Sequence, residues 1–301
     1  MKKIPIILDC DNTYGIYGCD VDDGLALLYL MGCPEADVIG ITCSFGNSNQ
    51  EAVYANTIRL LKDWGMENIP VYKGCFSSGN EKTEASVFLA ESAEKFRGTL
   101  KILCTGSTSN LASAAKINEN FYSQIAELSM MGGLTKPLFV GGKPMKELNF
   151  SCDSSSSLQI LKNVKNIKIA CAAHCLDSYF SAEELNSKLD SHPGAVSSYL
   201  RKTLKDWYDI NRTYWNIEGI VNWDVMAAAQ MMHPELFDLN PSIISPTEDS
   251  LTCGFLHGEG EEIRAFLPII KDKKIYSSHV YDRYFSAPVF PESGSQAADD
   301  L

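Results

Sequence analysis

The sequence predicts an α/β fold: a single domain with a mostly parallel central sheet flanked by helices, as in Rossmann-like proteins. The first two thirds of the 301 residues alternate short β-rich runs with helical runs. The β-rich runs are largely apolar, which is typical of strands covered on both faces. No convincing linker interrupts the chain, so we place one domain at residues 1–291 and expect the small, polar tail 292–301 to fray.

Each element follows from its local pattern, in chain order. Short apolar runs predict strands at Ile4–Leu8, Val38–Ser44, Ile69–Tyr72, Lys101–Thr105, Glu127–Met131 and Ile167–Ala172. The segments between them predict helices at Gly24–Met31, Gln50–Trp64, Lys82–Phe96, Ser109–Lys116 and Ser155–Lys162. Further helices are predicted at Ala182–Lys188, Val196–Tyr214 and Trp223–Met232. From Ser250 to Phe285 the pattern is β-like again, and we interpret it as a small antiparallel addition.

Composition argues against several classes of function. The formal net charge is -12, which repels phosphate backbones and anionic lipid, so we expect no nucleic-acid or membrane partner. No stretch has the length of a membrane span or a signal peptide, so a cytoplasmic location is expected. The ten cysteines are expected to be free thiols. Cys171, His174 and Cys175 suggest zinc but lack a fourth ligand at regular spacing.

Aspartates gather where the first strand ends and the first helix begins. Asp9 and Asp11 follow the first apolar run, and Asp22 and Asp23 open the next helix. Carboxylates placed together would repel one another, and a hard cation such as Ca²⁺ or Mg²⁺ would resolve that conflict. A single aspartate would be explained by helix capping or bonds to backbone amides. Four at one locus favour a metal site.

Two specific interpretations of this cluster can be weighed from the residues alone. An EF-hand loop would close with a glutamate near position 31, where Met31 stands. The segment Asp9–Thr13 fits the D-x-D-x-T motif of haloacid-dehalogenase-type phosphatases, with Asp9 as nucleophile, Mg²⁺ as cofactor and Thr105 in a second motif. The downstream lysine and acidic pair of that class are not clear, so the phosphatase is kept as an alternative.

A longer series of motifs resembles the inosine-uridine preferring nucleoside hydrolase family. That family opens with a strand, a D-x-D motif and a D-D pair heading an apolar helix, and the resemblance continues in order over most of the chain. The further matching segments are ITCSFGN (41–47), CTGSTSNLA (104–112), MMGG (130–133), ELN (147–149) with Asp153, CLDS (175–178) and Trp223-Asp224. The resemblance implies the nucleoside hydrolase fold. It also implies hydrolysis of the N-glycosidic bond of ribonucleosides to free base and ribose, a step of purine or pyrimidine salvage.

The resemblance also assigns roles to individual residues. It implies that Asp11, Asp23, Asp224 and the backbone carbonyl of Thr105 hold Ca²⁺, and that Asp11 is the general base for the attacking water. The implied substrate-binding residues are Asp22, Asn47, Met131, Glu147, Asn149 and Trp223. The expected partner is a small nucleoside. A homodimer or homotetramer is expected, because the family is commonly oligomeric.

The chain departs from the family pattern on the side of the base. Trp223 stands where many members have a histidine that is proposed to protonate the leaving base, so no general acid is named. Stacking of the base on Trp207, Tyr208, Tyr214, Trp215 or Trp223 is our hypothesis for its activation. A nucleoside- or ribose-binding homologue without catalysis is a second alternative.

Two loops also depart from the family pattern. The segment 12–21 is longer than in the family, and we expect a lid or an oligomer contact there. Gly141 and Gly142 stand where many members place an asparagine, and they predict a flexible turn. A modified riboside is therefore a candidate substrate.

Overall fold

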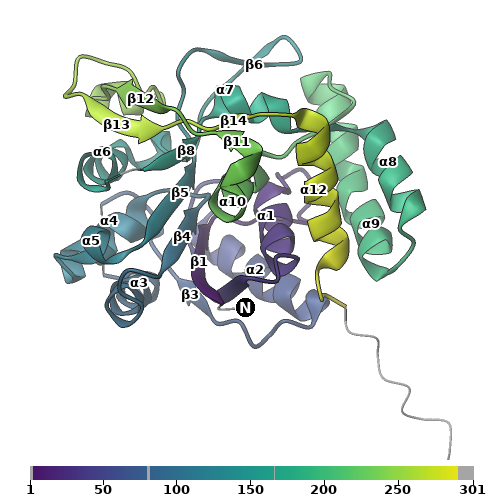
Figure 1. Ribbon diagram of the computed structural model, residues 1–301, viewed down its shortest axis with the longest axis horizontal. Coiled ribbons are helices and arrows are strands. Elements are labelled where there is room, and N and C mark those ends of the chain that lie inside the picture. Colours follow the sequence, from purple (N-terminus) through teal and green to yellow (C-terminus); the bar gives the residue numbers. More distant parts are fainter. Residues whose placement is uncertain (1–2, 80–81, 166, 291–301) are drawn as a thin grey trace, which may run out of the picture.

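A computed structural model describes residues 3–79, 82–165 and 167–290 and shows a layered α/β architecture (Figure 1). Its centre is an eight-stranded sheet in the order β12-β13-β8-β5-β4-β1-β2-β3. The strands are β1 (Ile4–Cys10), β2 (Ala36–Cys43), β3 (Val71–Lys73), β4 (Lys101–Cys104), β5 (Glu127–Met131), β8 (Lys168–Ala170), β12 (Pro241–Ile244) and β13 (Ile263–Phe266). Neighbouring strands are parallel except β12 and β13, which confirms the predicted mostly parallel sheet.

Helices cover both faces of the sheet and form two apolar layers with it. Ile6 and Leu8 of β1 pack in one layer and Ile7 in the other, as the alternation of side chains along a strand requires. The first layer contains α1 (Asp22–Met31), α2 (Gln50–Trp64), α10 (Trp223–Met232) and α12 (Lys273–Ser286), and the second contains α3 (Glu84–Lys95), α4 (Ser109–Ile117) and α6 (Ser154–Asn163). Strands with apolar residues on both faces are therefore buried between helices, as predicted.

The predicted elements up to residue 232 are present, with their ends shifted by a few residues. Helix α8 (Ala182–Ser191) is followed by α9 (Ala195–Ile210), which continues into a π-helical turn, Asn211–Trp215. These helices lie beside α12, away from the sheet (Figure 1). The long helix expected at Val196–Tyr214 is thus confirmed, apart from the change of helical geometry in its last turn.

The β-like interpretation of Ser250–Phe285 is wrong for much of that segment. It contains β13 and β14 (Ile269–Ile270), and each of them pairs antiparallel with a strand that lies before Ser250, but Lys273–Ser286 forms α12. Asp272 caps this helix by accepting hydrogen bonds from the backbone N–H groups of Lys274 and Ile275. The buried residues of α12 are Tyr276, Val280, Tyr281 and Tyr284. Aromatic and β-branched residues resemble a strand pattern, but their spacing fits one buried helix face.

Shorter elements complete the structure. Outside the central sheet, β6 (Leu138–Val140) pairs with β7 (Lys143–Met145), β9 (Tyr179–Ser181) with β10 (Gly219–Val221), and β11 (Phe237–Asp238) with β14. The short helices are α5 (Phe121–Gln124), α7 (Ala172–Cys175) and α11 (Glu248–Leu251). In the described ranges, no helix is long and apolar enough to cross a membrane. All ten cysteines are free thiols, as predicted.

The turn between β6 and β7 is a tight hairpin. Gly141 and Gly142 have φ of 53° and 83°, the positive values that a two-residue turn of this kind needs at both positions. A Cβ on Gly141 would lie 1.6 Å from the carbonyl oxygen of Trp215. The hairpin therefore packs closely on the π-helical turn. The prediction of a flexible turn is wrong, because this contact holds the turn in place.

The order of the strands identifies one edge of the sheet as a candidate binding site. The chain passes from β1 to β2 and β3 on one side and then returns to β4 on the other side of β1. Ligands of open α/β sheets bind at the carboxyl ends of the strands, beside such a reversal. Asp11 follows β1 and Thr105 follows β4, so the acidic motif begins at this point.

Candidate active site

Three aspartates from two helix N-termini form the centre of the site. Asp22 and Asp23 open α1, and Asp224 lies in the first turn of α10; these two helices pack against each other (Figure 1). One carboxylate oxygen of each aspartate lies within 4.8 Å of the others, a grouping that can hold a metal ion. The helix dipoles place partial positive charge at these N-termini, which offsets part of the repulsion.

Asp11 lies beside this group and is held by the Gly46-Asn47 turn. Asn47 donates two hydrogen bonds to the Asp11 carboxylate, from its backbone N–H (2.6 Å) and from Nδ2 (3.2 Å). A Cβ on Gly46 would lie 1.9 Å from Asp11 Oδ2, so only glycine allows the turn to approach this closely. Asn47 thus orients Asp11 as well as lining the cleft.

Thr105 connects the acidic cluster to the rest of the predicted pocket. Its Oγ1 donates to Asp23 Oδ1 at 2.6 Å, and its carbonyl oxygen accepts a hydrogen bond from Asn149 Nδ2 at 2.9 Å. Asn149 Nδ2 also donates to the carbonyl oxygen of Met131 at 3.1 Å. The Asn149 amide therefore joins the carboxyl ends of β4 and β5, and three residues predicted separately lie at one place.

The Glu147 carboxylate is held by hydrogen bonds from backbone N–H groups, two of them in the loop that this residue begins. Its carboxylate accepts hydrogen bonds from the backbone N–H groups of Gly133 (3.2 Å), Phe150 (2.8 Å) and Ser151 (2.9 Å). The side chain also lines the cleft. Glu147 therefore fixes the position of Asn149, two residues later, and presents negative charge to the cleft.

Burial raises the pKa of the clustered aspartates. Removal from water raises the pKa of Asp11 to about 7 and that of Asp22 to about 6. Burial, followed by repulsion from neighbouring aspartates, raises the pKa of Asp23 and of Asp224 well above the usual range. Anionic carboxylates in such a cluster need protons or a cation. An all-oxygen donor set is what Ca²⁺ and Mg²⁺ prefer, so the residues fit a hard divalent cation.

Eight of the ten predicted residues line one cleft. Its lining includes Asp22, Asn47, Thr105, Met131, Glu147, Asn149, Trp223 and Asp224. Asp11 and Asp23 are buried, with exposed fractions of 0% and 2%. The structure thus brings together all ten residues that the sequence assigned to metal, catalysis or substrate.

Asp20 is a cleft residue that the sequence reasoning missed. It lines the cleft beside Asp22, and burial together with the charge of Asp22 raises its pKa well above the usual range. Thr13 Oγ1 donates to the Asp20 carbonyl oxygen at 3.0 Å, which holds this end of the loop in place. A third acid two residues before Asp22 was a signal that could have identified it.

An aromatic wall, which we define as Trp207, Trp215 and Trp223, lines an adjoining cleft. That cleft shares Asp20, Asn47, Met145 and Trp223 with the acidic one. Tyr208 and Tyr214, which were predicted with these tryptophans, do not line it. The structure therefore narrows the predicted base-binding aromatics to the three indoles.

The long loop 12–21 forms part of both clefts and is anchored from beneath. Tyr14 is fully buried, its hydroxyl lies 2.7 Å from Thr203 Oγ1, and Arg59 Nη2 donates to its carbonyl oxygen at 2.9 Å. Gly18 and Cys19 line the cleft of the aromatic wall. The loop is thus a wall of the site, and its predicted role as a lid or oligomer contact stays a prediction.

Asp9 does not have the surroundings of a nucleophile. Its exposed fraction is 0%, and its Oδ1 accepts hydrogen bonds from Thr42 (2.6 Å) and Asn110 (2.8 Å). Burial raises its pKa to about 6. The side chains that contact Asp9 are uncharged, whereas Asp11 contacts Asp23 of the acidic cluster. Asp9 thus lies outside the group that would hold the Mg²⁺ of a phosphatase, which argues against that alternative.

Histidines are absent from the linings of both clefts, as far as the described residues show. His174 Nδ1 lies 3.1 Å from the carbonyl oxygen of Pro268. Within the same ranges, Cys171, His174 and Cys175 do not form a group of metal ligands. Neither cleft therefore offers a histidine to protonate a leaving base.

Comparison with known proteins points to the family that the motifs resemble. A family model described as inosine-uridine preferring nucleoside hydrolase matches residues 6–274. A probable uridine nucleosidase 2 of Arabidopsis thaliana is 24% identical over 280 residues, which cover 83% of this chain and 84% of the relative.

Solved structures agree on the fold. A plant nucleoside hydrolase matches with a TM-score of 0.81 at 19% identity, over 94% of this chain and 99% of the other. A purine-preferring ribonucleoside hydrolase from Gardnerella vaginalis matches with a TM-score of 0.79 at 19% identity, over the same shares. The predicted nucleoside hydrolase fold is confirmed.

Proposed function

The chain belongs to the inosine-uridine preferring nucleoside hydrolase family, and we propose that its acidic cleft hydrolyses ribonucleosides with Ca²⁺ bound and Asp11 as general base. The chain is accordingly an N-ribohydrolase, which releases a free base and ribose. The observation that carries the proposal is the cluster of Asp11, Asp22, Asp23 and Asp224 beneath a cleft lined by amide side chains.

The cation would be held by Asp11, Asp23, Asp224 and the carbonyl oxygen of Thr105. When bound, Ca²⁺ neutralises the clustered carboxylates and lowers the pKa of a coordinated water. Asp11 accepts the proton of the attacking water, and the two bonds from Asn47 fix its carboxylate for that task. A fixed base loses less orientational freedom at the moment of reaction.

The remaining carboxylates and amides would hold the ribose. Breaking the glycosidic bond develops positive charge on the sugar, which the anionic Asp22 and Glu147 stabilise more in the transition state than in the substrate. Asn47 and Asn149 offer amide groups to the ribose hydroxyls, and Met131 supplies an apolar contact. Sugars that lack a hydroxyl would leave these polar groups unpaired and would bind poorly.

The base would lie against the aromatic wall. Stacking on Trp223, with Trp207 and Trp215 beside it, stabilises a base that has taken a proton from solvent, because an indole face attracts positive charge. The protonated base then takes the bonding electron pair and leaves as a neutral molecule. This replaces direct protonation by a histidine, which the cleft lacks among its described lining residues. Protonation of the base by solvent completes the proposal.

A substrate panel tests the proposal. Purine, pyrimidine and nicotinamide ribosides are supplied with Ca²⁺, beside a generic phosphate ester, and free ribose and phosphate are measured. We expect ribose release from at least one riboside and none after chelation. Phosphate release without ribose would instead support the phosphatase. Riboside binding without turnover would support the non-catalytic homologue.

Two further expectations, the oligomeric state and the cellular location, belong to this proposal. We expect a homodimer or homotetramer, which light scattering after size-exclusion chromatography measures. We also expect the protein to act in the cytoplasm as part of nucleoside salvage, which fractionation of the source cells tests. The identity of the base is left to the substrate panel.

A further inference from the structure

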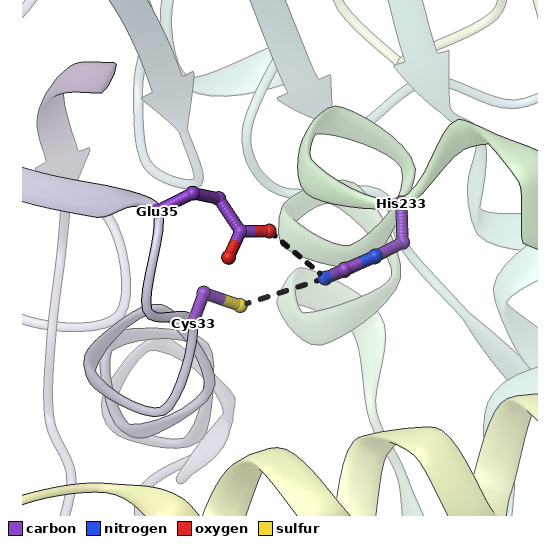
Figure 2. Close-up of side chains that lie close together, drawn as sticks. All are labelled: Cys33, Glu35 and His233. Atoms are coloured by element: carbon purple, nitrogen blue, oxygen red, sulfur yellow. Dashed lines mark hydrogen bonds and ion pairs between the residues drawn. The ribbon is translucent and has the colours of Figure 1, made fainter. Parts of the chain in front are cut away.

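A second group of possible metal ligands lies at the opposite ends of the two helices that carry the catalytic aspartates. Cys33 follows α1, Glu35 precedes β2, and His233 follows α10. Because α1 spans ten residues, this group lies about 15 Å along the helix from Asp22. Figure 2 shows the three side chains pointing toward one another from these segments.

The spacing of the three ligand atoms fits one small cation. His233 Nε2 lies 3.3 Å from Glu35 Oε1 and 4.0 Å from Cys33 Sγ, and all three ligand atoms lie within 4.8 Å of one another (Figure 2). A tetrahedral zinc ion, with bonds of about 2.0–2.3 Å, places its ligand atoms about 3.3–3.8 Å apart. Closing the group around such an ion needs shifts of only a few tenths of an ångström to about 1 Å.

The chemistry of the donors selects a different kind of ion from that of the acidic cluster. Thiolate and imidazole ligands favour zinc-class transition metals, whereas Ca²⁺ prefers oxygen alone. A thiolate at Cys33 and the carboxylate of Glu35 together neutralise a divalent charge. The exposed fractions are 2% for Cys33, 19% for the Glu35 side chain and 16% for that of His233, so an ion can enter from the Glu35 and His233 side.

One contact of His233 supports the tautomer that a metal needs. Its Nδ1 lies 3.0 Å from Glu235 Oε1, and a bond from Nδ1–H to that carboxylate leaves Nε2 facing Cys33 and Glu35. Metal-binding histidines commonly have such a carboxylate on the other ring nitrogen. His279, on α12, packs its ring 4.2 Å from that of His233, and its Nε2 lies 3.1 Å from the Tyr29 hydroxyl. These contacts restrict the motion of the imidazole.

We propose that Cys33, Glu35 and His233 form a second metal site, for Zn²⁺ or a similar transition-metal ion, with water as the fourth ligand. The ion joins the turn between α1 and β2 to the end of α10. Binding replaces the proton of the Cys33 thiol, so it releases a proton and stabilises the folded chain. The site is separate from the proposed hydrolytic reaction.

Co²⁺ tests the site, because a Co²⁺–thiolate bond gives a charge-transfer absorption band that a Co²⁺–carboxylate bond does not give. Chelator-treated full-length protein is titrated with Co²⁺ while excess Ca²⁺ fills the acidic cluster. We expect one thiolate-to-metal charge-transfer band that saturates at one ion per chain. Cys33→Ser should abolish the band. His233→Gln should weaken Co²⁺ binding about tenfold or more. Cys253→Ser, at an exposed free thiol, is the matched control and should retain the band.

A second variant keeps the test decisive if Cys33→Ser does not fold. Glu35→Gln changes a partly exposed side chain and leaves the thiol in place, so it should fold, bind Co²⁺ more weakly and lose most of the rise in Tm that Zn²⁺ gives the wild type. A Co²⁺ band that persists in Cys33→Ser would overturn the proposal. Absence of the band in the wild type, or unchanged Zn²⁺ stabilisation in Glu35→Gln, would do the same.

Discussion

The acidic wall of one cleft and the aromatic wall of the adjoining cleft differ in how they are built. The acidic wall brings Asp11, Asp22, Asp23 and Asp224 together from strand and helix ends. Their mutual repulsion must be offset by bound protons or by a cation. The aromatic wall is uncharged, and its indoles come from α9, the π-helical turn and the start of α10. The difference teaches that the residues proposed to hold the metal and the ribose match the family motifs, whereas the side proposed for the base departs from the motif at Trp223.

The largest effect is expected at the acidic wall. Asp11→Asn keeps the shape of the side chain but removes the base, so kcat should fall about 10²- to 10⁴-fold with little change in KM. Steady-state ribose release measures it. Asp190→Asn, at an exposed ion pair with Arg201, is the control and should retain full activity. A variant of Asp11 that keeps most of the activity would remove this residue as the base.

The aromatic wall should contribute less and should act through the base. Trp223→Ala removes a stacking partner, so kcat/KM for the preferred riboside should fall about 10- to 100-fold, while Trp223→Phe should retain most of it. A panel of bases at fixed sugar separates this from damage to the ribose pocket. An equal loss for a substrate with a non-aromatic leaving group would contradict a role in base recognition.

The acidic wall could be predicted from the sequence because its residues stand at the ends of regular elements. An apolar strand ending at Cys10 and an apolar helix starting at Asp22 fix where those carboxylates lie, since parallel strands end at one edge of the sheet. Membership of the nucleoside hydrolase family and the class of enzyme are confirmed. The Ca²⁺ ion, the base Asp11 and the oligomer stay predictions.

The parts that could not be predicted depend on long-range packing. Asp20 lies in an irregular loop, and its approach to Asp22 depends on the burial of Tyr14 against α2 and α9. The segment of α12 has a strand-like pattern, because its tyrosines and Val280 favour strands. Burial of these residues on one face makes the segment a helix. The hairpin turn at Gly141 becomes fixed only by its contact with Trp215.

The charge of the acidic wall should also make stability depend on pH. Burial raises the pKa of Asp11 to about 7 and that of Asp22 to about 6, so between about pH 4 and pH 7 the cation-free native state binds more protons than the unfolded chain. The stability that these bound protons contribute is complete below that window and is lost as pH rises through it. We expect the Tm of chelator-treated protein to fall from about pH 4 to about pH 7.

Two controls connect this fall to the acidic wall. Saturating Ca²⁺ should remove most of it, because the cation then replaces the protons. Asp22→Asn should reduce its slope in the chelated protein, since one of the titrating groups is gone. Calorimetric scans across the range measure both. A Tm that rises steadily with pH in chelator would show that the aspartates do not titrate as their burial implies.

The smallest effect is expected at Asp177, and it defines where the acidic wall ends. This residue belongs to the CLDS motif of the family resemblance, yet its carboxylate forms an ion pair with Lys273 at 2.7 Å and does not line either cleft. The Asp177 side chain is 40% exposed, and water screens a pair of this kind, so it adds little stability. Asp177→Asn should therefore leave kcat/KM within about twofold of the wild type and change Tm by less than about 2 °C. A loss of activity comparable with that of Asp11→Asn would extend the acidic wall beyond the cleft and remove the distinction drawn between its two sides.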